Sequence, residues 1–200
     1  KVTNEEEILF LEIYKMLFKE LNKNADFLNY FIKLTHAQEH SKRQALKGTS
    51  LEEIIQITSD KGGFSCLLLR SVLDKSIKPD EEKAFYQLGV MSQLMDDIFD
   101  WYDDTKNHVK TVANSMTLNE FELFYRNELD RVIQLFSKID NSSTFISLIK
   151  LLLSPGLVCL NHYKELNIET TGSIAGIDRS RVICDMELFK NQWKLLKIAL

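Results

Sequence analysis

Residues 93–104 read Gln-Leu-Met-Asp-Asp-Ile-Phe-Asp-Trp-Tyr-Asp-Asp and place five aspartates within nine residues. At 100° per residue on a helical wheel, the five aspartates occupy an arc of roughly 120°, and Gln93 lies within that arc. The opposite arc is apolar and consists of Leu88, Met91, Leu94, Met95, Ile98, Phe99 and Tyr102. This pattern predicts an amphipathic helix whose apolar side packs into a core.

The acidic side of this helix needs compensation. Aspartate is a poor residue for a helix interior, and like charges four residues apart repel each other by about 0.2–0.5 kcal/mol per pair. A divalent cation bound by carboxylate oxygens would offset this cost, and Mg²⁺ is favoured if a phosphate supplies the remaining ligands. The alternative is a solvated acidic face without a ligand. Such faces usually mix lysine with aspartate, whereas this arc carries no positive charge.

Length and composition favour a single helical domain. The 200 residues are 44% hydrophobic, which is enough for a substantial core, and seven glycines and two prolines leave little room for the turns of an all-β fold. The net charge of -4 gives no electrostatic footprint for nucleic acid. We therefore expect an all-α protein that does not bind nucleic acid.

The cysteines and the apolar runs suggest a cellular compartment. Cys66, Cys159 and Cys184 are widely separated, and none belongs to a CxxC pair. Neither a disulfide framework nor a thiolate zinc site is therefore expected, and a reducing, cytoplasmic environment fits best. No apolar run approaches the roughly 18 residues of a membrane span and no signal peptide opens the chain, so an integral membrane protein is not expected.

Helix boundaries follow from capping signals and apolar periodicity. Three pairs have the spacing of a capping box and precede apolar residues at helical intervals, namely Thr3 with Glu6, Ser50 with Glu53 and Thr117 with Glu120. Helices are expected at about 4–22, 25–46, 50–75, 79–104, 117–139, 142–153, 156–166 and 178–198. The longest non-helical stretches, 105–116 and 167–177, have the size of functional loops. Arg179 and Arg181 are expected to lie on the surface of the last helix.

Lys61 lies where an apolar residue belongs on the helix predicted for 50–75. Gly62 and Gly63 follow it directly, at a cost of about 1 kcal/mol each relative to alanine in a helix interior. The two glycines indicate the close approach of a partner helix or a ligand, or a local break. Lys61 can extend its ammonium to solvent along its methylene stem. If it faces the aspartates instead, it can neutralise them or bind an anion that a metal also holds.

Two motifs together resemble a known family. Lys61-Gly62-Gly63 is followed after about thirty residues by Gln93-x-x-Asp96-Asp97-x-x-Asp100, and this arrangement resembles the second half of an all-trans prenyl diphosphate synthase or another class I isoprenoid synthase. The resemblance runs from about residue 5 to 115. It implies an isoprenoid synthase-like helical bundle with a central cavity. Residues 1–200 are then expected to form one helical domain, the C-terminal two-thirds of such a synthase domain.

The resemblance also implies site residues. Those implied to bind Mg²⁺ are Asp96, Asp97, Asp100 and Asp104, with Asp97 either a direct ligand or a supporting residue beside the ligands. Those implied to bind the substrate diphosphate are Lys61, Lys106 and Lys110. Gln93 is implied to support the metal cluster, and it forms the catalytic set together with Lys61, Asp96, Asp97 and Asp100. Lys106 or Lys110 would close over the phosphate from the loop after the motif.

The spacing of Asp96, Asp100 and Asp104 also resembles the triad of terpene cyclases that binds one magnesium ion. Chain elongation, cyclisation and head-to-head condensation therefore remain alternatives. All three ionise an isoprenoid diphosphate, and Mg²⁺ with lysines stabilises the charge on the leaving pyrophosphate. An apolar surround protects the carbocation from water. The expected function is thus a Mg²⁺-dependent prenyltransferase or terpene synthase-like enzyme of isoprenoid biosynthesis.

The sequence departs from the family in one respect. Both kinds of enzyme need a first aspartate-rich motif on an earlier helix, and none occurs between Lys1 and Gly48. The chain is then expected to be an N-terminally incomplete copy of a synthase domain. The alternative is a catalytically silent helical partner or regulatory subunit, like those of heteromeric prenyl synthases, so both a homodimer and a heteromer are compatible with the resemblance.

Overall fold

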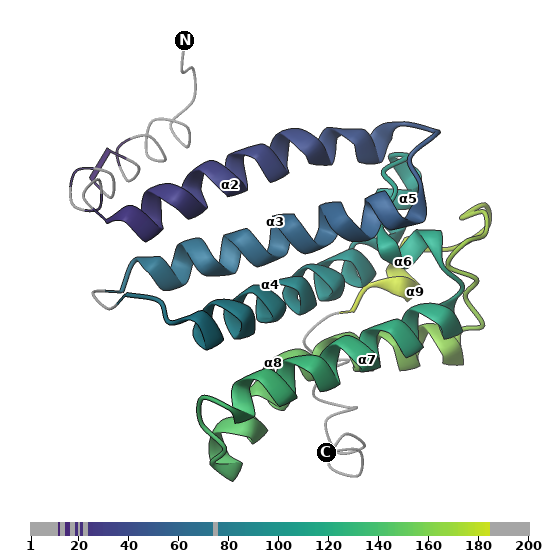
Figure 1. Ribbon diagram of the computed structural model, residues 1–200. Helices are drawn as coiled ribbons and strands as arrows, with labels where there is room; N and C mark the ends of the chain where they lie inside the picture. The colour runs from purple at the N-terminus through teal and green to yellow at the C-terminus, as the bar shows by residue number, and fades with distance from the viewer. Residues whose placement is uncertain are drawn as a thin grey trace.

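The protein is described by a computed structural model that covers residues 24–73 and 76–184, with single positions at 12, 15, 16, 19 and 21. Every regular element in these residues is a helix, so the predicted all-α class is confirmed for the part of the chain that the structure describes. Figure 1 shows α2, α3 and α4 running side by side, with α7 and α8 paired below them. The short helices α5, α6 and α9 gather at one end of this arrangement.

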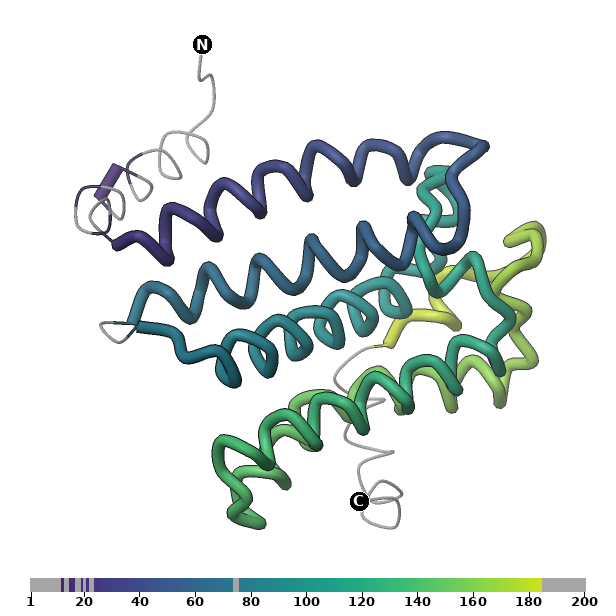
Figure 2. The backbone as a smooth tube through the Cα atoms, in the orientation of Figure 1, coloured from purple at the N-terminus to yellow at the C-terminus, as the bar shows by residue number. Residues whose placement is uncertain are grey.

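The helices are α2 (Ala25–Ser41), η1 (Lys42–Ala45), α3 (Leu51–Ser71), α4 (Pro79–Phe99), α5 (Trp101–Lys106), α6 (Val112–Ser115), α7 (Leu118–Ser137), α8 (Ser143–Glu165) and α9 (Arg179–Val182). Figure 2 traces this path and shows the chain returning after α8 to the end of the molecule where α5 and α6 lie. The predicted helix at 4–22 falls mostly outside the described residues, as does the part of the predicted helix at 178–198 beyond residue 184.

Two of the three predicted capping boxes can be checked. Ser50 and Thr117 both cap a helix start, but only the pair in α7 forms the complete box, because the Glu53 carboxylate bonds to Arg43 instead. The Ser50 hydroxyl accepts a hydrogen bond from the Glu53 amide at 3.2 Å. At the start of α7, the Thr117 amide donates to the Glu120 carboxylate at 2.9 Å, and the reciprocal bond is also present. These local bonds satisfy amides that the first helical turn leaves unpaired. The pair Thr3 and Glu6 lies outside the described residues.

The glycines after Lys61 pack against a neighbouring helix. A Cβ atom placed on Gly62 would lie 2.2 Å from the carbonyl oxygen of Gly89 in α4, and one placed on Gly63 would lie 2.4 Å from the ring of Tyr86. Helix α3 continues without interruption through both positions. Of the interpretations that the sequence left open, the approach of a partner helix is therefore confirmed and a local break is wrong. This contact sets the distance between α3 and the acidic helix α4.

The acidic stretch is divided at one residue. A single helix was predicted over 79–104, but α4 ends at Phe99, and Asp100 joins it to α5 with φ -91° and ψ 5°. The backbone hydrogen bonds still have the helical spacing of four residues. The Asp100 amide donates to the Asp96 carbonyl at 2.9 Å, and the Asp104 amide donates to the Asp100 carbonyl at 2.8 Å. The aspartates therefore lie on one nearly continuous helical track.

Helix α8 passes through a proline that was predicted to separate two helices, at 142–153 and 156–166. That prediction is wrong, since α8 is continuous across Pro155. Pro155 has no amide hydrogen for the carbonyl of Leu151 four residues earlier. The Ser154 hydroxyl donates to this carbonyl at 2.8 Å and replaces the missing bond. A side-chain bond from within the helix thus preserves the helical course.

The core lies between α4, α7 and α8 and is rich in aromatic residues. Its largest fully buried side chains are Trp101, Tyr125, Tyr163, Phe121 and Phe136. Two of these buried side chains have polar groups that are hydrogen-bonded. The Tyr125 hydroxyl donates to the Leu153 carbonyl at 2.7 Å, and the Trp101 indole donates to the Thr170 carbonyl at 2.8 Å. The second bond attaches the loop after α8 to the helix that carries the acidic residues.

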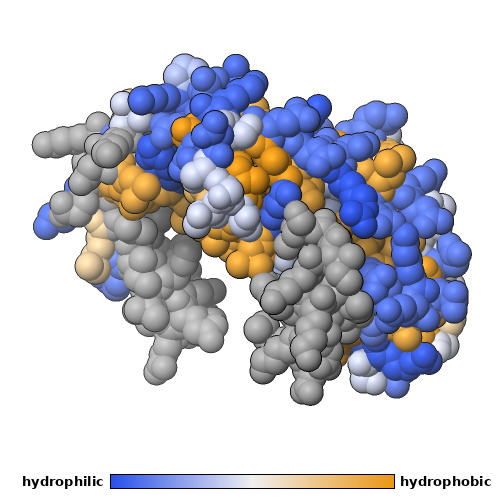
Figure 3. Space-filling model, turned by 90° about the horizontal axis from the view of Figure 1, so that it is seen from below, coloured by the Kyte–Doolittle hydropathy of each residue, from blue (hydrophilic) through white to orange (hydrophobic). Residues whose placement is uncertain are grey.

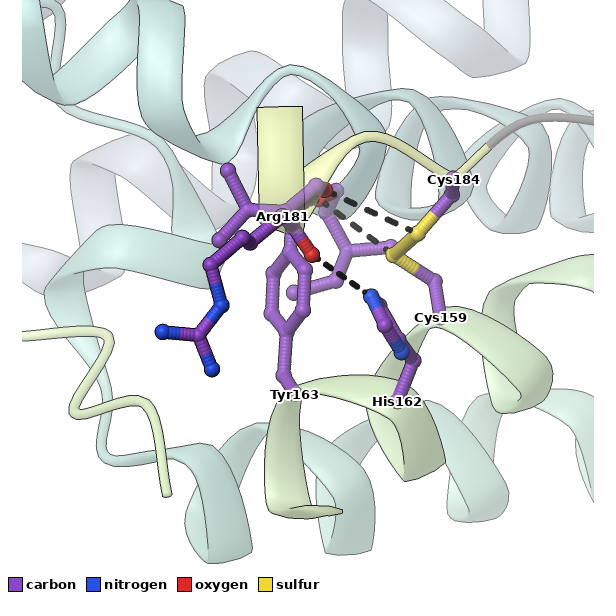
Figure 4. The surroundings of a disulfide bond; sticks show 7 residues. Cys159, His162, Tyr163, Arg181 and Cys184 are labelled. Carbon is purple, nitrogen blue, oxygen red and sulfur yellow. Dashed lines mark hydrogen bonds between the residues drawn. A yellow bond between two sulfur atoms is a disulfide. The ribbon is translucent and has the colours of Figure 1, made fainter. Parts of the chain in front are cut away.

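A disulfide joins α8 to the segment after α9. Cys159 and Cys184 are bonded, with Cα atoms 5.9 Å apart, so the prediction that the cysteines form no disulfide is wrong. Figure 4 shows His162 and Tyr163 beside this bond; the His162 ring nitrogen lies 2.8 Å from the Arg181 carbonyl. The Tyr163 hydroxyl lies 3.2 Å from the carbonyls of both Ile98 and Val182. The inference of a reducing compartment from the cysteines loses its basis, and cytoplasmic localisation stays a prediction.

Helix α8 also bears on the membrane prediction. Contrary to the expectation that no apolar run is long enough, α8 could cross a membrane by length and composition, although 44% of its apolar window is buried inside the protein. The core helix of a water-soluble protein passes the same test, and α8 packs against α4 and α7. Figure 3 shows apolar surface among hydrophilic residues in the view from below. The absence of a membrane span stays a prediction.

Candidate functional site

Three aspartates and one lysine form the candidate site, which we call the acidic row: Asp96 from α4, Asp100 at the junction, Asp104 from α5 and Lys61 from α3. Partial burial, followed by the charges of Asp96 and Asp103, raises the pKa of Asp100. Burial, followed by the charges of Asp100 and Asp96, raises the pKa of Asp104 to about 6. Lys61 opposes both increases. The four side chains therefore interact electrostatically, as the motif spacing predicts.

Gln93 connects two neighbouring aspartates. Its amide nitrogen donates to Asp96 Oδ2 at 2.8 Å and is 3.3 Å from Asp97 Oδ1. Because Gln93 precedes Asp96 by three residues and Asp97 by four, one helical face brings all three side chains together. Gln93 thus orients the carboxylate of Asp96, and this geometry is compatible with the supporting role that the resemblance implies.

Asp97 faces the interior. Its side chain is 3% exposed, and its Oδ2 accepts hydrogen bonds from the Thr58 hydroxyl and the Val112 amide, each at 3.3 Å. Burial raises its pKa to about 7, although the hydrogen bonds from Gln93 and Val112 oppose this increase. Asp97 therefore links α3, α4 and α6 beneath the acidic row. This placement favours the supporting role over direct metal binding, the two roles that the motif left open.

Asp103 pairs with an arginine from the distant end of the described chain. The Arg179 guanidinium donates to Asp103 Oδ2 at 2.6 Å and to Oδ1 at 3.0 Å. This pairing lowers the pKa of Asp103. Arg179 is exposed, as expected for a surface arginine, but its contact with Asp103 was not predicted. The available signal was an arginine directly after Asp178, whose side chain caps α9 by accepting from the Ser180 amide at 2.9 Å.

The two lysines of the loop after α5 lie in different surroundings. Lys106 is exposed at the end of α5 and helps lower the pKa of Asp103. The Lys110 ammonium instead donates to the carbonyls of Lys47 at 2.9 Å and Thr49 at 3.1 Å, in the loop before α3. Of the lysines implied to bind a diphosphate, Lys61 and Lys106 therefore lower the pKa of nearby aspartates. Lys110 is instead hydrogen-bonded to the loop before α3.

The donor chemistry of the acidic row suits a hard cation such as Mg²⁺. Its carboxylate oxygens are the ligands that Mg²⁺ prefers. The pKa values of Asp100 and Asp104 are raised first by burial and then by repulsion from neighbouring aspartates, and a bound cation would offset both effects. In the described residues, however, no three histidine, cysteine, aspartate or glutamate side chains form a group that could hold one ion by themselves.

Comparison with known proteins adds no relative. No protein-family model, no curated protein and no solved structure matches this chain. The function proposed below therefore depends on the residues of the acidic row and on the motif resemblance.

Proposed function

We propose that the protein is a Mg²⁺-dependent enzyme that ionises an allylic isoprenoid diphosphate, as prenyltransferases and class I terpene synthases do. The observation that carries this proposal is the convergence of Asp96, Asp100 and Asp104 with Lys61 in the acidic row. Magnesium would supply electrostatic stabilisation of the pyrophosphate leaving group. Because the protein offers few ligands at any one point, phosphate oxygens would complete the coordination.

The cations around the acidic row have separate tasks in this proposal. Lys61 would contact the diphosphate from α3, the helix that the glycine contact holds close to α4. Arg179 would contribute a second positive charge, because its guanidinium already lies at Asp103. Lys106 would reach the phosphate from the end of α5. Lys110 would have to break two hydrogen bonds to do so.

A pocket along α3 supports the isoprenoid part of the proposal. Phe64, Leu67, Tyr86 and Leu135 contribute to its lining, and its volume is about 610 Å³. Phe64 follows Lys61 by three residues, which is about one turn and roughly 4.5 Å along the helix. A substrate whose diphosphate lies at Lys61 could extend an apolar chain toward this pocket.

The test is the release of pyrophosphate from allylic diphosphates of several chain lengths in the presence of Mg²⁺. Asp96→Ala and Asp100→Ala should reduce the rate by at least about 100-fold, because each removes charge stabilisation from the transition state. Asp130→Ala is the matched control, since Asp130 is an exposed aspartate of α7, and it should leave the rate unchanged. Equal release by wild type and both acidic-row variants would exclude the proposed metal role.

A catalytically silent partner subunit is the second candidate. It is favoured by the engagement of two aspartates in structural contacts, Asp97 with Thr58 and Asp103 with Arg179. A silent subunit would bind a non-cleavable diphosphate analogue in a Mg²⁺-dependent manner, yet would release no pyrophosphate. Isothermal titration calorimetry alongside the release assay separates the two candidates.

A further inference from the structure

A second pocket lies where three loops meet. It has a volume of about 580 Å³ and lies between the end of η1, the segment from α5 to α6, and the loop after α8. The described residues that line it include Lys47, His108 and Lys110 but no aspartate or glutamate. In a chain with a net charge of -4, the two lysines make this a local concentration of positive charge. Its volume is typical of a small-molecule site.

The most buried cation of this pocket is held in place before any ligand arrives. The Lys110 ammonium donates to the carbonyls of Lys47 and Thr49. Its backbone is bonded on both sides to Gln44, whose carbonyl accepts from the Lys110 amide and whose side chain donates to the Lys110 carbonyl, each at 2.9 Å. Two ammonium hydrogens are thus engaged and a third can be offered to an anion. A charge fixed in this way binds at a lower entropic cost.

His108 occupies a backbone conformation that glycine usually takes. Its φ is 58°, in the left-handed region. Its amide donates to Thr105 at 3.2 Å and the Val109 amide donates to Asp104 at 2.9 Å, which is the pattern that ends many helices with glycine at this position. A non-glycine residue here costs about 1 kcal/mol or more. Despite this cost the position holds a histidine, which contributes an imidazole to the pocket; glycine would contribute no side chain.

We infer that this pocket binds a small phosphate monoester, with the phosphate at Lys47, His108 and Lys110 and the organic group against Leu46 and Val109. The Thr105 hydroxyl, which also lines the pocket, can donate to a phosphate oxygen. Two lysines and a hydroxyl match a dianion with three oxygens better than a carboxylate. No aspartate of the acidic row lines the pocket among the described residues, so the inference goes beyond the proposed function.

The experiment is calorimetric titration of the full chain with phenyl phosphate in the presence of EDTA, which removes divalent metal from the acidic row. Inorganic phosphate should compete, phenol should not bind, and benzoate should bind more weakly. Lys47→Met preserves the backbone carbonyl that holds Lys110, and it should weaken binding about tenfold, the effect of one charge-assisted hydrogen bond. His108→Gly should weaken binding while the melting temperature stays equal or rises, because glycine adopts the left-handed conformation at less cost.

Two control variants distinguish binding in this pocket from binding at the acidic row. Asn167 has a similar conformation, with φ 54°, at the end of α8 and does not line this pocket, so Asn167→Gly should not change the affinity. Lys61→Met should also leave the affinity unchanged in EDTA. A loss of binding in Lys61→Met would place the anion at the acidic row and overturn the inference, while the proposed function would stand. Absence of binding by wild type, or equal binding by Lys47→Met, would also overturn it.

Discussion

At the scale of single residues, the aspartates divide by surroundings rather than by sequence. All five share one helical arc, yet Asp97 is enclosed, Asp103 is neutralised by Arg179, and the other three form the acidic row with Lys61. The arc could be predicted because it follows from helical geometry alone. The division depends on Thr58, Val112 and Arg179, whose positions are set by tertiary packing and are not visible in local sequence.

Asp97 should make stability depend on pH. Its pKa in the native state is raised from an ordinary 3.8 to about 7. A group with a raised native pKa stabilises the native state below its unfolded pKa, and this contribution is lost as the pH rises through the native pKa. Between about pH 4 and pH 7, the contribution of Asp97 to the free energy of unfolding should therefore decrease with rising pH. Asp97→Asn, which cannot ionise, should lessen this decrease in urea unfolding measurements at pH 5 and pH 7.5.

Asp130→Asn, on the exposed face of α7, is the control for this prediction. It should retain the pH dependence of the wild type. If Asp97→Asn also retains it in full, Asp97 does not hold its proton in the native state at pH 5.

At the scale of elements, helices with strong local signals could be predicted and their interruptions could not. The starts of α3 and α7 follow from caps within four residues of sequence. The continuity of α8 across Pro155 could not be predicted, because a proline usually ends a helix. The hydrogen bond that replaces the missing one depends on the orientation of the Ser154 hydroxyl toward the Leu151 carbonyl, which local sequence does not determine. The glycines after Lys61 predicted the close approach of a partner helix as one possibility, but the sequence did not indicate that Gly89 would be the contact; this depends on the packing of α3 on α4.

The contact between α3 and α4 should be intolerant of a single methyl group. In Gly62→Ala, the new Cβ would meet the backbone of Gly89, which cannot move aside as a side chain can. We expect a loss of about 1–3 kcal/mol in the free energy of unfolding. Gly48→Ala is the control, because nothing lies within 4 Å of a Cβ there. Chemical denaturation of both variants checks this, and equal stability of Gly62→Ala and wild type would show that the helices can separate without cost.

Ser154 should matter more than its small side chain suggests. Ser154→Ala leaves the Leu151 carbonyl without the bond that Pro155 cannot provide, and we expect a loss of about 1 kcal/mol in thermal or urea unfolding. Ser137 in α7 makes the same type of bond, to Gln134 at 2.9 Å, on an exposed surface and without a proline. Ser137→Ala should therefore cost less. Equal losses in the two variants would mean that the proline has no part in the effect.

At the scale of the whole molecule, the segment after α8 closes one end of the structure. It is attached through the bond between Trp101 and Thr170, the ion pair of Arg179 and the disulfide of Cys159. None of these attachments could be predicted from sequence, because each joins residues that lie far apart along the chain and lack a local pattern. Composition predicts that the chain folds into helices, but it does not predict which distant residues meet.

The disulfide should contribute measurably to stability. Cys159 and Cys184 are separated by 25 residues, and closing a loop of this size typically stabilises a protein by about 2–4 kcal/mol. Cys184→Ser should lower the melting temperature and expose residues 167–184 to proteolysis, and a thiol reductant should do the same to the wild type. Cys66→Ser, which removes the free cysteine, is the control for thiol loss. An unchanged melting temperature in Cys184→Ser would show that other contacts suffice to hold the segment.

The ion pair between Asp103 and Arg179 also has a consequence for biosynthesis. These partners are 76 residues apart, and Trp101 and Thr170 are 69 apart. A ribosome adds about 5–20 residues per second, so α4 and α5 emerge several seconds before the segment that completes their surroundings. During the first part of that interval α7 and α8 have not yet emerged, so the apolar side of α4 that packs against them is still uncovered. Proteins that shield nascent chains would therefore have a binding surface on the apolar side of α4 until α7 and α8 pack against it.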